Sequence, residues 1–77
     1  MNKERRKRLD SLLEKLAAAE EELQAIMDEE QEAFDNMPES IQGSERGETM
    51  EEGIATMEEA LCSLQDIQEQ LEGVSEQ

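Results

Sequence analysis

The chain has 77 residues, one aromatic side chain, no histidine and a formal charge of −15, from seven Lys or Arg against twenty-two Asp or Glu. A chain of this length forms one domain at most and is marginal for a self-sufficient core. The lack of histidine and the single cysteine, Cys62, exclude the usual zinc and iron sites and an internal disulfide, and the negative charge argues against direct binding of nucleic acid.

The first half of the chain has the apolar spacing of a helix. Its apolar residues recur at alternating steps of three and four, which keeps them on one side of an α-helix. No Gly or Pro interrupts before Pro38, so we predict one helix from about residue 3 to about residue 36. Leu13, Met27 and Phe34 widen its stripe on one side, and Glu30 is the one polar exception. The stripe itself comprises Leu9, Leu12, Leu16, Ala19, Leu23, Ile26, Ala33 and Met37.

A turn is predicted at about residues 37–43, with room for one short helical turn at residues 39–42. Pro38 stops the first helix, because it lacks a donor and disfavours helical geometry in the residue before it. Gly43 is expected in a left-handed conformation, and Ser44 is a good N-cap for the next helix. We expect Arg46 to pair back with Asp35 or Glu32. The residues expected to fix the turn are Phe34, Asn36, Pro38, Gly43, Ser44 and Arg46.

The second half repeats the helical spacing from about residue 44 to about residue 72. Gln68 replaces one expected apolar residue of its stripe, which comprises Met50, Ile54, Met57, Leu61, Leu64 and Leu71. Further small or apolar residues flank it, namely Gly53, Ala60, Ile67 and Val74. Gly47 and Gly53 weaken the first turns of the helix by up to about 1 kcal/mol each. Either glycine would also allow another backbone to approach closely.

The predicted fold is all-α, an antiparallel coiled-coil-like hairpin of two helices, because long helices joined by a short turn pack side by side. The first stripe is widened on one flank and the second stripe on the opposite flank. Each is wider than a two-helix seam requires. We therefore predict that two hairpins pair as a homodimer in a four-helix bundle. The alternative is a monomer that needs a different partner.

Charge is unevenly distributed along the chain. Residues 1–8 carry five cations and one anion, and we interpret this basic start as an electrostatic clasp to Glu69, Glu72 and Glu76, with a phosphate-binding arm as the alternative. The end of the predicted hairpin that contains the turn, here called the turn end, carries almost only negative charges. It is either a solvated surface or a surface that engages a basic groove on another protein. The candidate partner-binding residues are Glu29, Glu32, Asp35, Glu39, Glu45, Glu48, Glu51 and Glu52.

The carboxylates give little support for a metal site or for an enzyme. Clustered carboxylates can hold Ca²⁺ or Mg²⁺, but the ordered spacing of an EF-hand loop is missing. Nucleotide pyrophosphohydrolases of the MazG type use Glu-x-x-Glu and Glu-x-x-Asp motifs. Glu29/Glu32 and Glu48/Glu51 fit the first motif, but no Glu-x-x-Asp follows in the second helix. We therefore expect no enzyme, no cofactor and no bound metal.

The most specific stretch is the block EEQEAFDNMPES followed by SERGE and MEE. From roughly Asp28 to Leu64 it resembles short acidic proteins encoded by bacteriophages, prophages and other mobile elements of bacteria. No activity comes with this resemblance. It implies a viral or mobile-element origin and an intracellular role in a bacterium.

These observations together predict a non-catalytic, acidic protein-binding module. Its specific form would be a phage-encoded inhibitor that occupies the basic, nucleic-acid-binding surface of a host defence protein. A structural or assembly module is the alternative, in which the apolar stripe meets the partner. No segment is apolar enough for a membrane helix or a secretory signal, so the sequence predicts a soluble protein of the bacterial cytoplasm.

Overall fold

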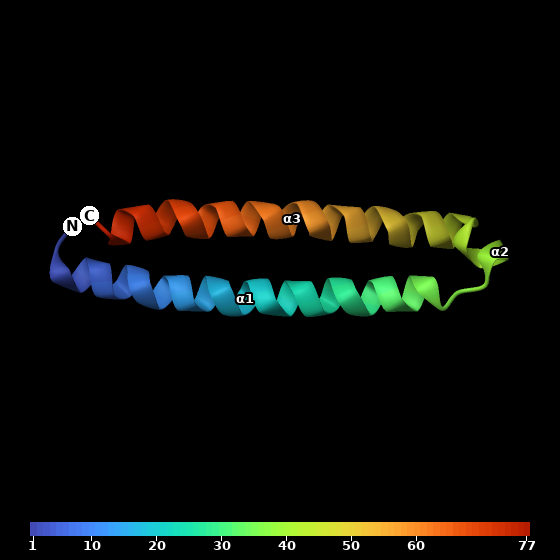
Figure 1. Ribbon diagram of the computed structural model, residues 1–77, viewed down its shortest axis with the longest axis horizontal. Helices are drawn as coiled ribbons and strands as arrows, with labels where there is room; N and C mark the ends of the chain where they lie inside the picture. The colour runs from blue at the N-terminus through green and yellow to red at the C-terminus, as the bar shows by residue number, and fades with distance from the viewer.

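The computed structural model describes residues 1–77 as a helical hairpin. Two long helices, α1 (Lys3–Asp35) and α3 (Glu45–Ser75), are joined by the short helix α2 (Glu39–Gln42). They run antiparallel and in contact along their length, which places both chain termini at one end and α2 at the other (Figure 1). The molecule measures 58 × 15 × 13 Å. The predicted all-α class and the two packed helices are confirmed.

The helix ends follow from local capping. Asn2 caps α1, because its side-chain Oδ1 accepts a hydrogen bond from the backbone N–H of Arg5 at 2.8 Å. Pro38 caps α2, and Ser44 caps α3 as predicted. The last helix extends to Ser75 rather than to about residue 72, because the helix continues through Gly73.

The seam between the helices follows an unbroken heptad spacing. In α3 it runs through the predicted stripe, where Leu61 is the one buried hydrophobic side chain, with 7% of its surface exposed. Apart from Gln24, the half-buried positions in and just after α1 are spaced by three and four residues: Arg6, Leu9, Leu13, Leu16, Glu20, Leu23, Met27, Glu30, Phe34 and Met37. Such a spacing is typical of two-stranded coiled coils.

The predicted stripe of α1 is therefore partly wrong. Leu13, Met27 and Phe34, expected on its margin, lie in the seam, whereas Leu12, Ala19, Ile26 and Ala33 are exposed. The true seam includes Glu20 and Glu30, which are half-buried between the helices. Glu20 is accommodated because α3 supplies amide donors to it, so its carboxylate keeps hydrogen-bond partners.

The exposed rows of both helices lie on the same side of the hairpin. A local two-fold axis relates two antiparallel helices, and it is perpendicular to the plane that contains them both. Residues at the same heptad position, which form a row along each helix, therefore lie on the same side of that plane in both helices. Every flanking residue directly precedes a seam residue in both helices. The expectation of opposite flanks is thus wrong. We call this side the apolar side and define it by Leu12, Ala19, Ile26, Ala33, Gly53, Ala60, Ile67 and Val74.

Candidate functional site

The turn is held by backbone contacts and by the side chain of Gln42. Its Nε2 donates to the carbonyl oxygens of Phe34, at 2.9 Å, and Met37, at 3.1 Å. The carbonyl of Phe34, in the last turn of α1, also accepts the N–H of Met37, so the amide of Gln42 adds a second bond there and a bond to the carbonyl just after the helix. Arg46, predicted to bridge the turn, has an exposed side chain instead. Gln42 carried no signal in the sequence, because its role depends on how α2 folds back towards α1.

Two glycines near the turn behave differently from each other. Gly47 is buried, and a Cβ built there would lie 2.0 Å from the carbonyl oxygen of Gln42 and 2.6 Å from that of Ile41. The expected close backbone approach is thus confirmed at Gly47, but nothing lies within 4 Å of a Cβ at Gly53. Gly43 adopts a right-handed conformation with φ −82°, so the predicted left-handed end is wrong.

Other turn residues act as the spacing predicts. The carbonyl of Pro38 accepts the N–H groups of Ile41, at 2.8 Å, and Gln42, at 3.0 Å, which starts α2. Asn36 ends α1, where its N–H donates to the carbonyl of Glu32 at 3.1 Å. The Oγ of Ser44 accepts from the N–H of Gly47 at 3.4 Å and donates to the carbonyl of Ile41. The turn is therefore a defined structure that presents its acidic residues in fixed positions.

The acidic residues of the turn end surround it rather than forming one face. They occupy several heptad positions on both helices, from Glu29 beside the apolar side to Glu51 on the opposite side, so their side chains point in several directions. All eight candidate partner-binding residues are exposed: Glu29, Glu32, Asp35, Glu39, Glu45, Glu48, Glu51 and Glu52. No group of three or more Asp, Glu or Cys side chains is arranged to hold a metal ion.

A shallow groove opens near the turn on the side opposite to the apolar side. Glu51 and Glu58 of α3 line it together with Gln31 of α1, over the apolar side chains of Phe34 and Ile54. The amide of Gln31 donates to Asp35 at 3.0 Å, which adds a third carboxylate nearby. An apolar floor with an anionic rim suits a Lys or Arg side chain, whose methylene stem and charged head require both.

A polar layer crosses the seam in the middle of the hairpin. Glu20 accepts from the amides of Gln65, at 3.1 Å, and Gln68, at 2.6 Å. A partly buried polar contact of this kind favours one register of the two helices, because a shift would leave the carboxylate without these donors. The sequence marked Gln68 as a break in the apolar stripe, and the structure shows which residue it meets.

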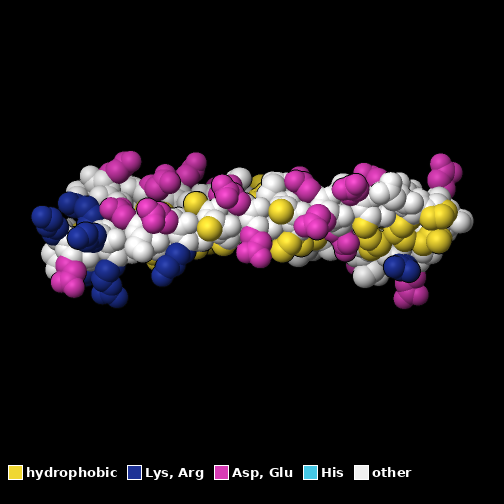
Figure 2. All heavy atoms as spheres, turned by 90° about the horizontal axis from the view of Figure 1, so that it is seen from below, with side chains coloured by type: hydrophobic (Ala, Val, Ile, Leu, Met, Phe, Trp, Pro, Cys, Tyr) yellow, Lys and Arg dark blue, Asp and Glu magenta, His cyan; other side chains and the backbone are white.

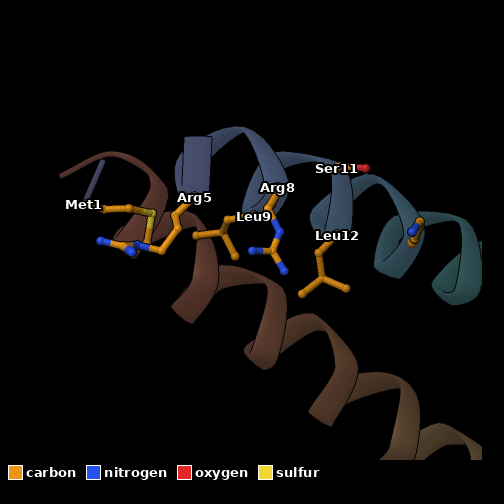
Figure 3. A pocket seen from close by; sticks show the side chains of 7 residues that line it. Met1, Arg5, Arg8, Leu9, Ser11 and Leu12 are labelled. Atoms are coloured by element: carbon orange, nitrogen blue, oxygen red, sulfur yellow. The ribbon is translucent and has the colours of Figure 1, made fainter. Parts of the chain in front are cut away.

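The end of the hairpin that holds both chain termini, here called the open end, carries the basic start of the chain. The guanidinium of Arg6, half-buried, donates to the backbone carbonyl of Gln77, and the hydroxyl of Ser75 donates to Asp10. These contacts, rather than ion pairs with Glu69, Glu72 or Glu76, join the two helices here. Figure 3 shows Arg5 and Arg8 on the same stretch of α1 as Leu9 and Leu12, where they line a shallow apolar pocket with Met1 and Lys15.

The apolar side differs from every other surface of the hairpin. Leu12, Ile26 and Ile67 have 45%, 48% and 45% of their surface exposed. Each of them lies in a row of small or apolar residues. In α3 the next row outward is uncharged, with Thr49, Thr56, Ser63 and Gln70, so the nine acidic residues of this helix lie elsewhere. Figure 2 shows most Lys and Arg side chains towards the end that holds the termini, and apolar atoms exposed mainly between the middle and the turn end.

Neither long helix contains a stretch apolar enough to cross a lipid bilayer. Comparison of the chain with known proteins finds no matching family model, no matching curated protein and no matching solved structure.

Proposed function

We propose that this protein is a non-catalytic binding module that pairs with itself through its apolar side and binds a basic protein through its acidic turn end. One observation carries the proposal, namely the division of the surface. A chain of charge −15 leaves one side of α3 without acidic residues and keeps the carboxylates of this helix on its remaining surface. The side without acidic residues suits a second hairpin, which would complete a four-helix bundle, and the carboxylates suit a cationic partner.

Limited burial supports the self-association. Leu61 is the one hydrophobic residue that the hairpin buries, whereas Leu12, Ile26 and Ile67 remain nearly half exposed. Burial of apolar surface contributes about 25 cal/mol per Å². Covering these side chains therefore adds stability that a single hairpin lacks. A structural or assembly role is the second candidate, in which the apolar side alone carries the contact.

The acidic turn end supports a partner that normally binds nucleic acid. Rows of carboxylates at fixed positions present charge of the same sign as phosphates, and a basic groove that binds phosphates attracts both. In bacteria such a partner would be a host nucleic-acid-binding or defence protein, and this chain would act as its inhibitor in the cytoplasm. The groove of Glu51 and Glu58 would receive one of the partner's Lys or Arg side chains.

Charge reversal tests the acidic surface. We expect the combined change Glu29→Lys, Glu32→Lys, Glu48→Lys and Glu51→Lys to abolish capture of basic proteins from a bacterial lysate, because it replaces attraction by repulsion at the turn end. Captured proteins are identified by mass spectrometry, and circular dichroism confirms that the helices persist. Added duplex DNA and raised salt should release the same proteins.

A matched control places the same change of charge at the open end, as Asp66→Lys, Glu69→Lys, Glu72→Lys and Glu76→Lys. This variant should still capture the partner. Capture that survives both the turn-end reversal and high salt would refute the acidic surface and support the assembly role, because apolar contacts persist in salt.

A further inference from the structure

We propose that the two hairpins of the dimer lie in reversed direction, with the turn end of each against the open end of the other. This inference rests on the self-association proposed above. Two face-to-face arrangements keep all neighbouring helices antiparallel. In the reversed one, α1 packs on α1 and α3 on α3 of the second copy. In the same-direction one, α1 packs on α3 of the second copy and both turn ends lie together.

Charge favours the reversed arrangement. Residues 24–53, which include the turn, contain ten Asp or Glu and one Arg. The open end, residues 1–12 and 66–77, contains six Asp or Glu and five Lys or Arg. The same-direction arrangement would bring two strongly negative turn ends together. The reversed arrangement sets each against a nearly neutral end with a basic start, which lowers the repulsion.

Side-chain size on α1 favours the same arrangement. If the two-fold axis of the dimer passes level with the point between residues 22 and 23, Leu12 lies against Ala33 of the second copy, and Ile26 lies against Ala19. Each large side chain thus meets a small one, which lets the two helices pack closely without voids or clashes. These four residues are exposed in the single hairpin.

The same rule holds on α3. Reversal about a point between residues 63 and 64 places Ile67 against Ala60 of the second copy, and Val74 against Gly53. The space beside Gly53, where a Cβ would meet nothing within 4 Å, is then filled. The same-direction arrangement sets Leu12 against Val74 and Ala33 against Gly53, so in these two outer pairs large meets large and small meets small. Its two central pairs, Ile26 with Ala60 and Ala19 with Ile67, still match large with small, so size favours the reversed arrangement through the outer pairs alone.

The two-fold axis of the dimer must pass one point on α1 and one on α3, and these two points lie at nearly the same height along the hairpin. Asp10 contacts Ser75, and Glu20 contacts Gln65. This register puts the point between residues 22 and 23 level with the one between residues 62 and 63. The point that α3 requires is one residue away, or about 1.5 Å along the helix. One two-fold axis therefore serves both helices.

Charges beside the apolar side agree with this alignment. Arg8 and Lys15 flank it in the first half of α1, and Glu22 and Glu29 flank it in the second half. Reversal brings Lys15 close to the level of Glu29 of the second copy. On α3 the flanking row is neutral, so α3 can approach its copy without repulsion.

Disulfide cross-linking tests the arrangement in full-length chains that carry C62S. Copies with A19C are mixed with copies with I26C and oxidised, and a parallel mixture combines A19C with I67C. We expect at least about tenfold more cross-linked dimer in the first mixture, because only there do the paired positions meet within disulfide reach. A19C alone should cross-link poorly, since the two copies of residue 19 would be about 10 Å apart along the axis.

Sedimentation equilibrium of the unmodified chain separates the two possible failures. A dimer that cross-links through A19C and I67C overturns the reversed arrangement and leaves the self-association standing. A monomer at all concentrations overturns the proposed self-association itself. A dimer that cross-links through A19C and I26C supports both.

Discussion

Gly47→Ala is expected to lower the free energy of unfolding by about 3 kcal/mol. The added Cβ would lie 2.0 Å from the carbonyl oxygen of Gln42 and 2.5 Å from its carbonyl carbon, and backbone atoms cannot rotate away as a side chain can. Helix α2 would have to move, which would break the bonds of Gln42 to Phe34 and Met37. Urea unfolding followed by circular dichroism measures the loss.

Gly53→Ala is the matched control, because it makes the same chemical change in the same helix. A Cβ at Gly53 meets nothing within 4 Å in the hairpin, and Ala is a better helix former by about 1 kcal/mol. We expect this variant to be as stable as the parent chain or slightly more so. A Gly47→Ala variant of unchanged stability would contradict the packing of α2 against the start of α3.

The double change Ile26→Glu and Ile67→Glu is expected to weaken the dimer at least about a hundredfold. Each Ile contributes apolar burial to the proposed interface, and each Glu would place an unpaired carboxylate there, next to those of an already negative molecule. Both side chains are nearly half exposed in the hairpin, so the helices should tolerate the change. Sedimentation equilibrium measures the dissociation constant.

The control for this variant carries the same added charge away from the apolar side, as Ala18→Glu and Cys62→Glu, both at exposed positions. This control should remain dimeric. Equal dissociation of both variants would attribute the effect to net charge rather than to the apolar side, and a stable dimer of Ile26→Glu and Ile67→Glu would place the interface elsewhere.

The helices and their limits at the turn could be predicted because local signals specify them. Apolar spacing, Pro38 and the Ser44 cap all act within a few residues, and the structure has them where the pattern indicates. The seam of α1 could not be chosen correctly. Three adjacent rows are apolar enough, and the two that pack contain Glu20 and Glu30. Only the donors on α3, which are distant in sequence, show why Glu20 is acceptable there.

The turn also combines features that local sequence predicts with features that it does not. The Ser44 cap depends on its own neighbours and was predictable, whereas the role of Gln42 depends on the path of α2 and was not. The left-handed conformation predicted for Gly43 is wrong because glycine permits that conformation without requiring it. The acidic residues of the turn end were identified by charge alone, but their distribution around the end required the relative rotation of both helices.

Thermal unfolding at different protein concentrations tests the central claim most directly, namely that the hairpin reaches its full stability by covering its apolar side with a second copy. A dimer that unfolds to separate chains is stabilised by mass action. We expect a midpoint temperature that rises by about 8 °C over a hundredfold increase in concentration. A midpoint that stays constant over that range, with a monomeric mass throughout, would contradict it.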